Sequence, residues 1–153
     1  MDGLLQRGIT CLTVLDVAGA ALERARQRLG PEAARVRWIE ADVTDAGSTL
    51  PPVDIWHDRA VFHFLTGAGE RDRYVAGLRA ALKAGGSAVI ATFAPHGPER
   101  CSGLPVARYS AASLGEVLGS GFRLAASEIE EHRTPSGAAQ AFQWCRFVFQ
   151  PGP

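Results

Sequence analysis

Short apolar runs alternate with longer amphipathic segments along most of the chain. A short apolar run bounded by turn residues is typical of a buried strand, whereas apolar residues at every third or fourth position predict a helix. The first such pair is a strand at Cys11–Val17 and a helix at Ala20–Leu29. Gly30 and Pro31 end this helix, because glycine favours the C-terminal cap and proline cannot continue a helix.

The same alternation continues through the middle of the chain. Two β-rich runs, Val36–Ala41 and Val53–Asp58, predict strands. They are followed by a helix at Glu70–Lys83, which the glycine pair at 85–86 ends, and by a strand of the fully buried kind at Ser87–Phe93.

The last third of the chain has a different order of elements. A short helix at Ala111–Leu118 precedes two extended runs, Phe122–Glu130 and Gln140–Phe149, with a turn at Pro135–Gly137 between them. Because no helix separates these strands, they predict an antiparallel hairpin at the sheet edge. Strands alternating with helices elsewhere predict an α/β fold: a Rossmann-like, doubly wound, mostly parallel sheet with helices on both faces.

Length and composition limit the possible functions. A chain of 153 residues is long enough for one domain, which we expect to span residues 1–153. Sixteen basic residues balance sixteen acidic ones, so no net charge attracts nucleic acid or a membrane. The three cysteines are far apart and form no CxxC pair, which argues against a disulfide framework or a zinc site. We expect a cytoplasmic protein that acts on a small molecule and binds no metal.

Aspartates stand at the ends of several predicted strands, at Asp16, Asp42 and Asp58. Ligands of open α/β sheets bind at the carboxyl ends of the strands. An acid such as Asp16, before a helix, can accept both hydroxyls of a ribose. Asp42 can accept a hydrogen bond from an exocyclic amine such as that of adenine. The alternative is that these aspartates only form turns and cap helices.

Four segments, in this order, resemble the class I S-adenosylmethionine-dependent methyltransferases. They match the second to fifth strands of that family with the helices that follow or precede them, and the Asp58–Arg59 pair is similar to the thiopurine methyltransferase-like branch. The segments are Leu12–Leu29, Val36–Val43, Val53–Leu65 and Leu78–Phe93.

The resemblance implies S-adenosyl-L-methionine as the cofactor. It implies that Asp16 binds the ribose hydroxyls and Asp42 the adenine amine, with Val17 and Val43 packed around the adenine. Residues at the mouth of the site, near the methionyl end of the cofactor, would be Asp58, Arg59 and Ala60.

Catalytic and substrate-binding residues follow from the same resemblance. As catalytic residues we predict the three at the end of the fourth family strand: His57, Asp58 and Arg59. His63 is a candidate substrate contact, although its apolar surroundings favour a core histidine instead. The loop Ala94–Tyr109 follows the fifth family strand, and from it we predict Arg100 and Tyr109 as substrate contacts; the alternative is that they are ordinary polar surface.

One part of the family pattern has no counterpart in this sequence. The family opens with a strand and a glycine-rich turn that lets the backbone approach the cofactor closely. Only Met1–Ile9 precedes the first predicted strand, and this segment resembles the tail of the first family helix. We therefore predict that the chain begins inside the domain. The missing strand would lie between those ending at Asp16 and Asp58, so their edges would be unpaired or would pair with each other.

Three functions fit these observations. The first is methyl transfer from S-adenosylmethionine to an unidentified small-molecule acceptor. The second is a noncatalytic remnant or interaction module with most of the same fold. The third is a nicotinamide-dependent Rossmann oxidoreductase, in which Asp16 would bind the ribose of a dinucleotide; it is disfavoured, because Asp42 and the terminal hairpin fit the methyltransferase pattern better.

Overall fold

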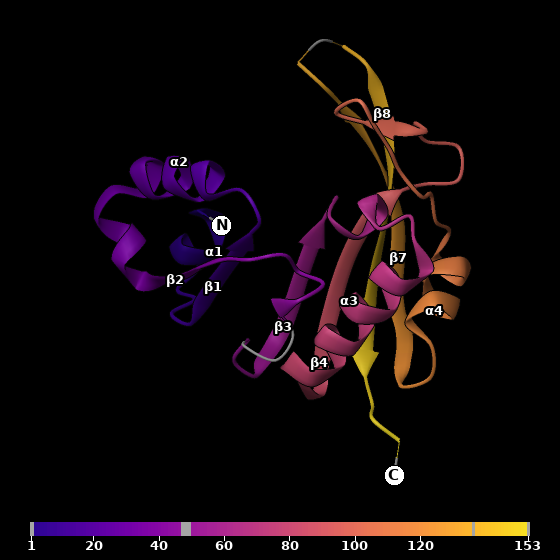
Figure 1. Cartoon of the computed structure of the whole chain (residues 1–153), viewed down its shortest axis with the longest axis horizontal. Helices are drawn as coiled ribbons and strands as arrows, with labels where there is room; N and C mark the ends of the chain where they lie inside the picture. Colours follow the sequence, from indigo (N-terminus) through magenta and orange to yellow (C-terminus); the bar gives the residue numbers. More distant parts are fainter. Residues whose placement is uncertain (1, 47–49, 136, 153) are drawn as a thin grey trace. The chain divides into compact units, whose positions relative to one another are not determined.

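The computed structural model describes residues 2–46, 50–135 and 137–152 (Figure 1). The chain forms two compact units, Met1–Ala46 and Gly47–Pro153, which are called the N-terminal unit and the C-terminal unit below.

The N-terminal unit is a small strand–helix–strand unit. Its two strands pair in parallel from Leu12 opposite Val36 to Asp16 opposite Glu40. Leu22 of the connecting helix is buried, as are Leu5 and Val36. The elements are α1 (Asp2–Gln6), β1 (Leu12–Asp16), α2 (Gly19–Leu29), the 3₁₀ helix η1 (Gly30–Arg35) and β2 (Val36–Glu40).

The predicted end of α2 is confirmed at Gly30, whose φ of 56° suits a residue without a side chain. The chain then continues into η1 instead of a loop. Pro31 lies in the first turn of η1, where its missing N–H has no intrahelical partner to lose.

The C-terminal unit contains a four-stranded mixed sheet in the order β3–β4–β8–β7 (Figure 1). β3 and β4 are parallel, and β4–β8 and β8–β7 are antiparallel, so the predicted C-terminal hairpin at the sheet edge is confirmed. The elements are β3 (Val53–Arg59), the 3₁₀ helix η3 (Phe62–Phe64), α3 (Ala68–Ala81), β4 (Leu82–Phe93), β5 (Arg100–Cys101), β6 (Leu104–Pro105), α4 (Ala111–Leu118), β7 (Phe122–Arg133) and β8 (Ala139–Phe149).

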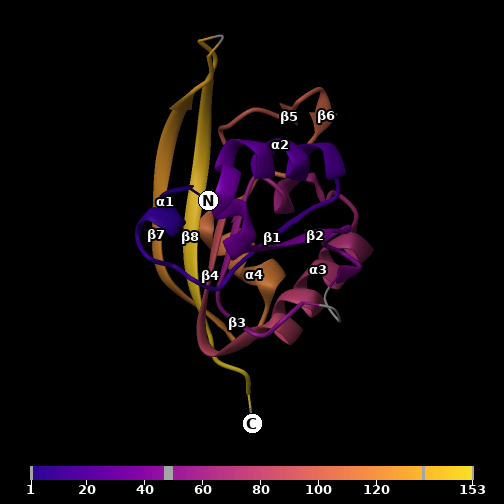
Figure 2. The same ribbon diagram turned by 90° about the vertical axis from the view of Figure 1, so that its left-hand side faces the viewer.

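Helices α3 and α4 pack on the same face of this sheet (Figure 2). Tyr74 of α3 stacks edge-on against Trp56 of β3, and Gly115 of α4 lies against the ring of Phe147 of β8. Side chains of neighbouring strands that lie opposite each other point to the same face. His57 and Arg59 alternate with Trp56 and therefore point to the other face of the sheet.

The boundary between α3 and β4 differs from the prediction. The helix ends at Ala81 and the strand begins at Leu82, ahead of the two glycines that were expected to separate them. Pairing of β3 with β4 shifts between Val53 opposite Leu82 and Ile55 opposite Ser87. The extra residues form a bulge, and Gly85 adopts a φ of 80° within it. The glycines therefore mark an irregularity within the strand.

β1 and β3 each have an edge without a strand partner among the described residues. β1 pairs with β2 alone, and β3 pairs with β4 alone. Within its own unit, each of the strands ending at Asp16 and Asp58 therefore has an unpaired edge, as one of the two predicted alternatives has it. Ile55, on β3, is 58% exposed.

Ser136 of the predicted hairpin turn lies outside the described residues, but the Gly137 N–H donates to the Thr134 carbonyl at 2.8 Å, as a tight turn requires.

Of the helices that the structure describes, none is long and apolar enough to span a bilayer.

The bulge gives a stability prediction. A Cβ added to Gly86 would lie 2.8 Å from the Lys83 carbonyl oxygen and 2.9 Å from that of Asp54, and backbone atoms cannot move aside cheaply. Gly86→Ala should lower the free energy of unfolding by about 1–3 kcal/mol. Gly69→Ala, in α3 with only the flexible end of Arg73 nearby, should be neutral or slightly stabilising. Urea unfolding of both variants measures this, and equal effects would contradict it.

Candidate functional site

Asp16 closes β1 at the carboxyl end of the N-terminal sheet. Its Oδ1 accepts a hydrogen bond from the Ala18 N–H at 2.8 Å, which fixes the orientation of the carboxylate. Oδ2 has no partner among the described residues, and the side chain is half-buried. The next residue, Val17, is 69% exposed and so presents an apolar surface beside the acid. A fixed acceptor beside an apolar surface is suited to a sugar hydroxyl next to a flat ring.

Asp42 follows the neighbouring strand and forms a turn of the same kind. Its Oδ1 accepts from the backbone N–H and the hydroxyl of Thr44, both at 2.8 Å. The Ala41 N–H donates to the Asp16 carbonyl at 3.1 Å, so the ends of the two strands are tied together. Both aspartates therefore have the turn-forming role that was the alternative to ligand binding. Asp42 is also exposed, and Val43 beside it is half-buried.

Glu40 is a third acid at this end, which the sequence analysis did not identify. It lies opposite Asp16 in the register of β1 and β2. Its carboxylate packs against the backbone of Gly19, where an added Cβ would lie 2.5 Å from Oε2. The absence of a side chain at the start of α2 is thus what makes room for Glu40. Only the strand register shows this, since Glu40 has no distinguishing motif.

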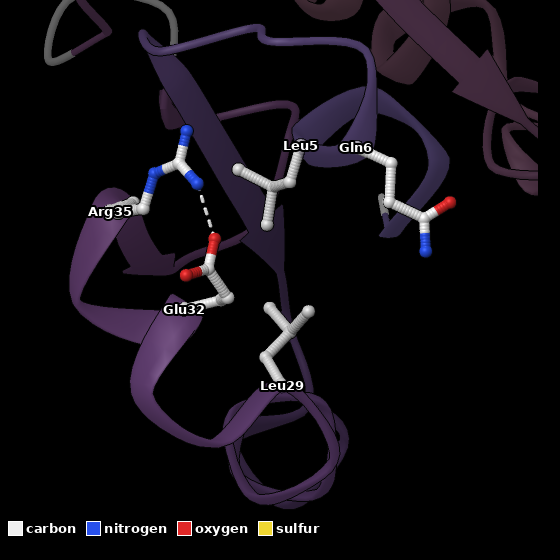
Figure 3. A pocket seen from close by; sticks show the side chains of 5 residues that line it. All are labelled: Leu5, Gln6, Leu29, Glu32 and Arg35. Carbon is white, nitrogen blue, oxygen red and sulfur yellow. Dashed lines mark hydrogen bonds and ion pairs between the residues drawn. The ribbon is translucent and has the colours of Figure 1, made fainter.

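A pocket of about 280 Å³ in the N-terminal unit does not coincide with these acids (Figure 3). The side chains of Leu5 and Leu29 face it, and Arg35 forms an ion pair with Glu32 at its side. Leu29 is at the far end of α2, which begins beside Asp16 and spans roughly 16 Å at 1.5 Å per residue. The pocket is therefore at the opposite end of this unit from the strand ends that bind ligands in such folds.

In the C-terminal unit, the corresponding strand end is organised by Asp58, which is 5% exposed. Its Oδ1 accepts the Val61 N–H at 2.9 Å, and its Oδ2 accepts the Phe62 N–H at 3.1 Å and the Tyr74 hydroxyl at 2.7 Å. The Tyr74 oxygen in turn accepts from Trp56 Nε1 at 2.9 Å. Asp58 thus links the end of β3 to the first turn of η3 and to α3.

Burial raises the pKa of Asp58, and the hydrogen bonds from Tyr74, Val61 and Phe62 act in the opposite direction. Burial also raises the pKa of Tyr74 well above its ordinary value, and the adjacent Asp58 adds to that effect. Both Asp58 oxygens are occupied by protein donors. This geometry favours a positioning role for Asp58 and differs from the catalytic and cofactor contacts expected from the sequence.

Ala60, the residue that leaves β3, has a φ of 66°. This left-handed conformation is unfavourable for a residue with a Cβ and is found where the surrounding structure enforces it, often at functional sites. Here the Ala60 N–H donates to the Ala91 carbonyl at 2.9 Å on one side, and Asp58 holds the following turn on the other.

Arg59 and His57 lie on the face of the sheet opposite α3, and both are exposed. The Arg59 guanidinium carbon is 4.6 Å from the centre of the Phe142 ring, and the His57 ring is 5.8 Å from that of Trp144. Trp144 Nε1 donates to Glu130 at 2.6 Å. Phe142 and Trp144 of β8 and Glu130 of β7 were not predicted as site residues. The sequence predicted the two strands that carry them, but not the face that they share.

The three predicted substrate contacts do not form one exposed site. His63 has no exposed surface, and the centre of its ring lies 4.7 Å from that of Phe93. His63 is therefore a core histidine, which was the predicted alternative to a substrate contact. Tyr109 is 7% exposed and packs on Phe62. Burial raises the pKa of Tyr109. Only Arg100, in β5, is exposed, and it donates to the Gly103 carbonyl in its own hairpin.

The chain is similar to solved methyltransferase structures. The N-methyltransferase NodS from Bradyrhizobium japonicum matches with a TM-score of 0.71 and 19% identity, over 92% of this chain and 74% of NodS. The 1,6-didemethyltoxoflavin-N1-methyltransferase from Burkholderia thailandensis matches with a TM-score of 0.74 and 19% identity, over 98% of this chain and 65% of that one. The sequence matches no family model and no curated protein. These similarities confirm the α/β methyltransferase fold predicted from the sequence.

The Asp58 network gives a prediction for Tyr74. Tyr74→Phe removes a donor to the buried carboxylate and the acceptor of Trp56 Nε1, and should lower the free energy of unfolding by about 1–3 kcal/mol. A double-mutant cycle with Asp58→Asn should show a coupling above 0.5 kcal/mol, because the two side chains are in direct contact. Additive effects in chemical unfolding would show that this hydrogen bond does not stabilise the fold.

His63 gives a prediction for pH. Burial lowers its pKa from 6.5 to about 4, so the unfolded chain takes up a proton that the folded chain does not. The stability contributed by neutral His63 is complete above pH 6.5 and is lost as the pH falls towards 4, by up to about 1.4 kcal/mol per pH unit. His63→Leu should flatten this part of the stability profile. If the stability of His63→Leu changed with pH as steeply as that of the wild type, His63 would not be the group responsible.

Proposed function

We propose that this chain, which has the fold of the class I S-adenosylmethionine-dependent methyltransferases, is the greater part of an enzyme that methylates a small molecule. The observation that carries the proposal is the fixed, half-buried Asp16 carboxylate beside exposed Val17 at the end of β1, with Asp42 after the adjacent parallel strand. Carboxylates in this arrangement suit a nucleoside.

The residues of the N-terminal unit fit the nucleoside part of the cofactor. Asp16 Oδ2, which has no partner among the described residues, would accept the ribose hydroxyls. The exposed carboxylate of Asp42 would accept from the adenine amine, and Val17 and Val43 would pack on the two sides of the adenine. Because Oδ1 of each aspartate is held by a backbone N–H, the acceptors need no reorganisation on binding.

Residues of the C-terminal unit would bind and orient the methyl acceptor. Bound S-adenosylmethionine supplies a methyl group on a positively charged sulfur, and its transfer depends mainly on alignment and on exclusion of water. His57, which is exposed, is the candidate to take a proton from the acceptor. Asp58 holds the turn that carries Ala60 and so fixes the backbone at this strand end.

We further propose that the two units belong to one partial methyltransferase domain. The supporting observation is that single solved structures match 92–98% of the chain, which includes both units. A nicotinamide-dependent activity is not favoured, since the two solved structures described above are named as methyltransferases. The names of those proteins do not identify the methyl acceptor of this one.

Calorimetric titration with S-adenosylhomocysteine tests the proposal. The full chain should bind it with a micromolar Kd, and Asp16→Ala should weaken binding at least tenfold, which corresponds to about 1.4 kcal/mol. Asp72→Ala removes an exposed acid of α3 and serves as the control, with unchanged binding. If the folded wild-type chain does not bind, or if both variants weaken it equally, the proposed cofactor site is wrong.

A further inference from the structure

The guanidinium of Arg59 is exposed and has no hydrogen-bond or ion-pair partner among the described residues. Four of the other arginines of the C-terminal unit are bound to the protein: Arg71, Arg79, Arg100 and Arg108 all donate to carbonyl or carboxylate oxygens. Arg59 instead lies on the ring of Phe142, 4.6 Å from its centre. Its N–H groups are therefore available to a ligand.

The sheet holds Arg59 in this position. Arg59 lies opposite Ala91 of β4, and Ala91 lies opposite Trp144 of β8. Since the side chain of Ala91 is small and fully buried, the longer side chain of Arg59 can cross over β4 to reach Phe142. Stacking on the ring then orients the planar guanidinium, and this ordering is complete before any ligand binds.

An apolar surface surrounds this cation. Ala91, Phe93 and Phe142 form a buried cluster, and partly buried residues pack against it: Ala60, Cys101, Val106 and Trp144. An ion pair is stronger beside apolar groups than in open water, and a guanidinium can bind a carboxylate through two parallel hydrogen bonds. Glu130, which lies opposite Phe142 in the register of β7 and β8, accepts from Trp144 Nε1.

Trp144 supplies a flat surface next to the cation. Its indole is half-buried, its orientation is fixed by the hydrogen bond to Glu130, and the ring of His57 lies 5.8 Å away at an angle of 48°. Aromatic side chains in this arrangement bind flat rings by offset or edge contacts. The cation and the indole lie on the same face of the same sheet.

We propose that the methyl acceptor is a planar aromatic molecule that carries a carboxylate, bound by Arg59 through the carboxylate and by Trp144 through the ring. This inference rests on the proposed methyltransferase function and specifies its acceptor class. Arg59 thereby acts as the residue that selects anionic acceptors, and the small side chain at position 91 is what allows it to do so.

Indole-3-acetate and its neutral isostere indole-3-acetamide are the probes, titrated into the full chain by NMR. The acetate should bind at least tenfold more tightly than the amide to the wild type. Arg59→Gln should reduce this preference to less than threefold. Arg146→Gln is the matched control, because Arg146 is an exposed arginine on the same face of β8, and it should keep the preference. Equal binding of both probes, or the same loss in both variants, would overturn the proposal.

A further variant separates the ring contact from the charge contact. Trp144→Leu should weaken both probes by a similar factor and leave their ratio unchanged, because it removes only the stacking surface. A thermal unfolding curve for each variant confirms that it is folded. If Trp144→Leu abolished the preference while Arg59→Gln did not, the assignment of the two residues would be wrong.

The carboxylate could also belong to the methionyl part of the cofactor. Repeating the titration with saturating S-adenosylhomocysteine distinguishes the two sources: a preference that persists supports an acceptor site, and one that disappears shows that Arg59 binds the cofactor and overturns the inference. If S-adenosylhomocysteine does not bind but the chain still prefers indole-3-acetate over the amide, only the proposed methyltransferase function is refuted.

Discussion

The buried carboxylate of Asp58 is the interaction on which the end of β3 depends. It accepts hydrogen bonds from two backbone N–H groups of the following turn and from the hydroxyl of Tyr74. An unpaired carboxylate could not be buried to this extent, because removing its charge from water is costly. The network therefore requires the strand, the turn and α3 to form together.

This constraint also determines what the strand end presents to a ligand. Because Asp58 points towards α3, its neighbours His57 and Arg59 must point to the opposite face. The turn that Asp58 holds forces Ala60 into a left-handed conformation and ends the strand immediately after Arg59. The hydrogen bonds that Asp58 makes within the protein thus control the orientation of both neighbours.

The elements with strong periodicity were predicted closely. Ala111–Leu118 has the predicted bounds, and the strand–helix pair around Asp16 differs by one residue or so, because apolar spacing and turn residues act locally. The predicted boundary at the glycine pair was displaced, since the same residues can end a helix or form a bulge. Among the predicted site residues, His63 is buried, as its apolar neighbours in the sequence favoured.

The sequence by itself determined the order of strands and helices, the acids that end the strands and the resemblance to methyltransferases, because these depend on residue types at short separations. Only the tertiary structure decided which residues are buried and which share a face. It directed Asp58 inwards to Tyr74, and it brought Arg59 onto Phe142, 83 positions further along the chain. Such contacts depend on strand register and on side-chain size across the sheet, and both become fixed only when distant segments pair.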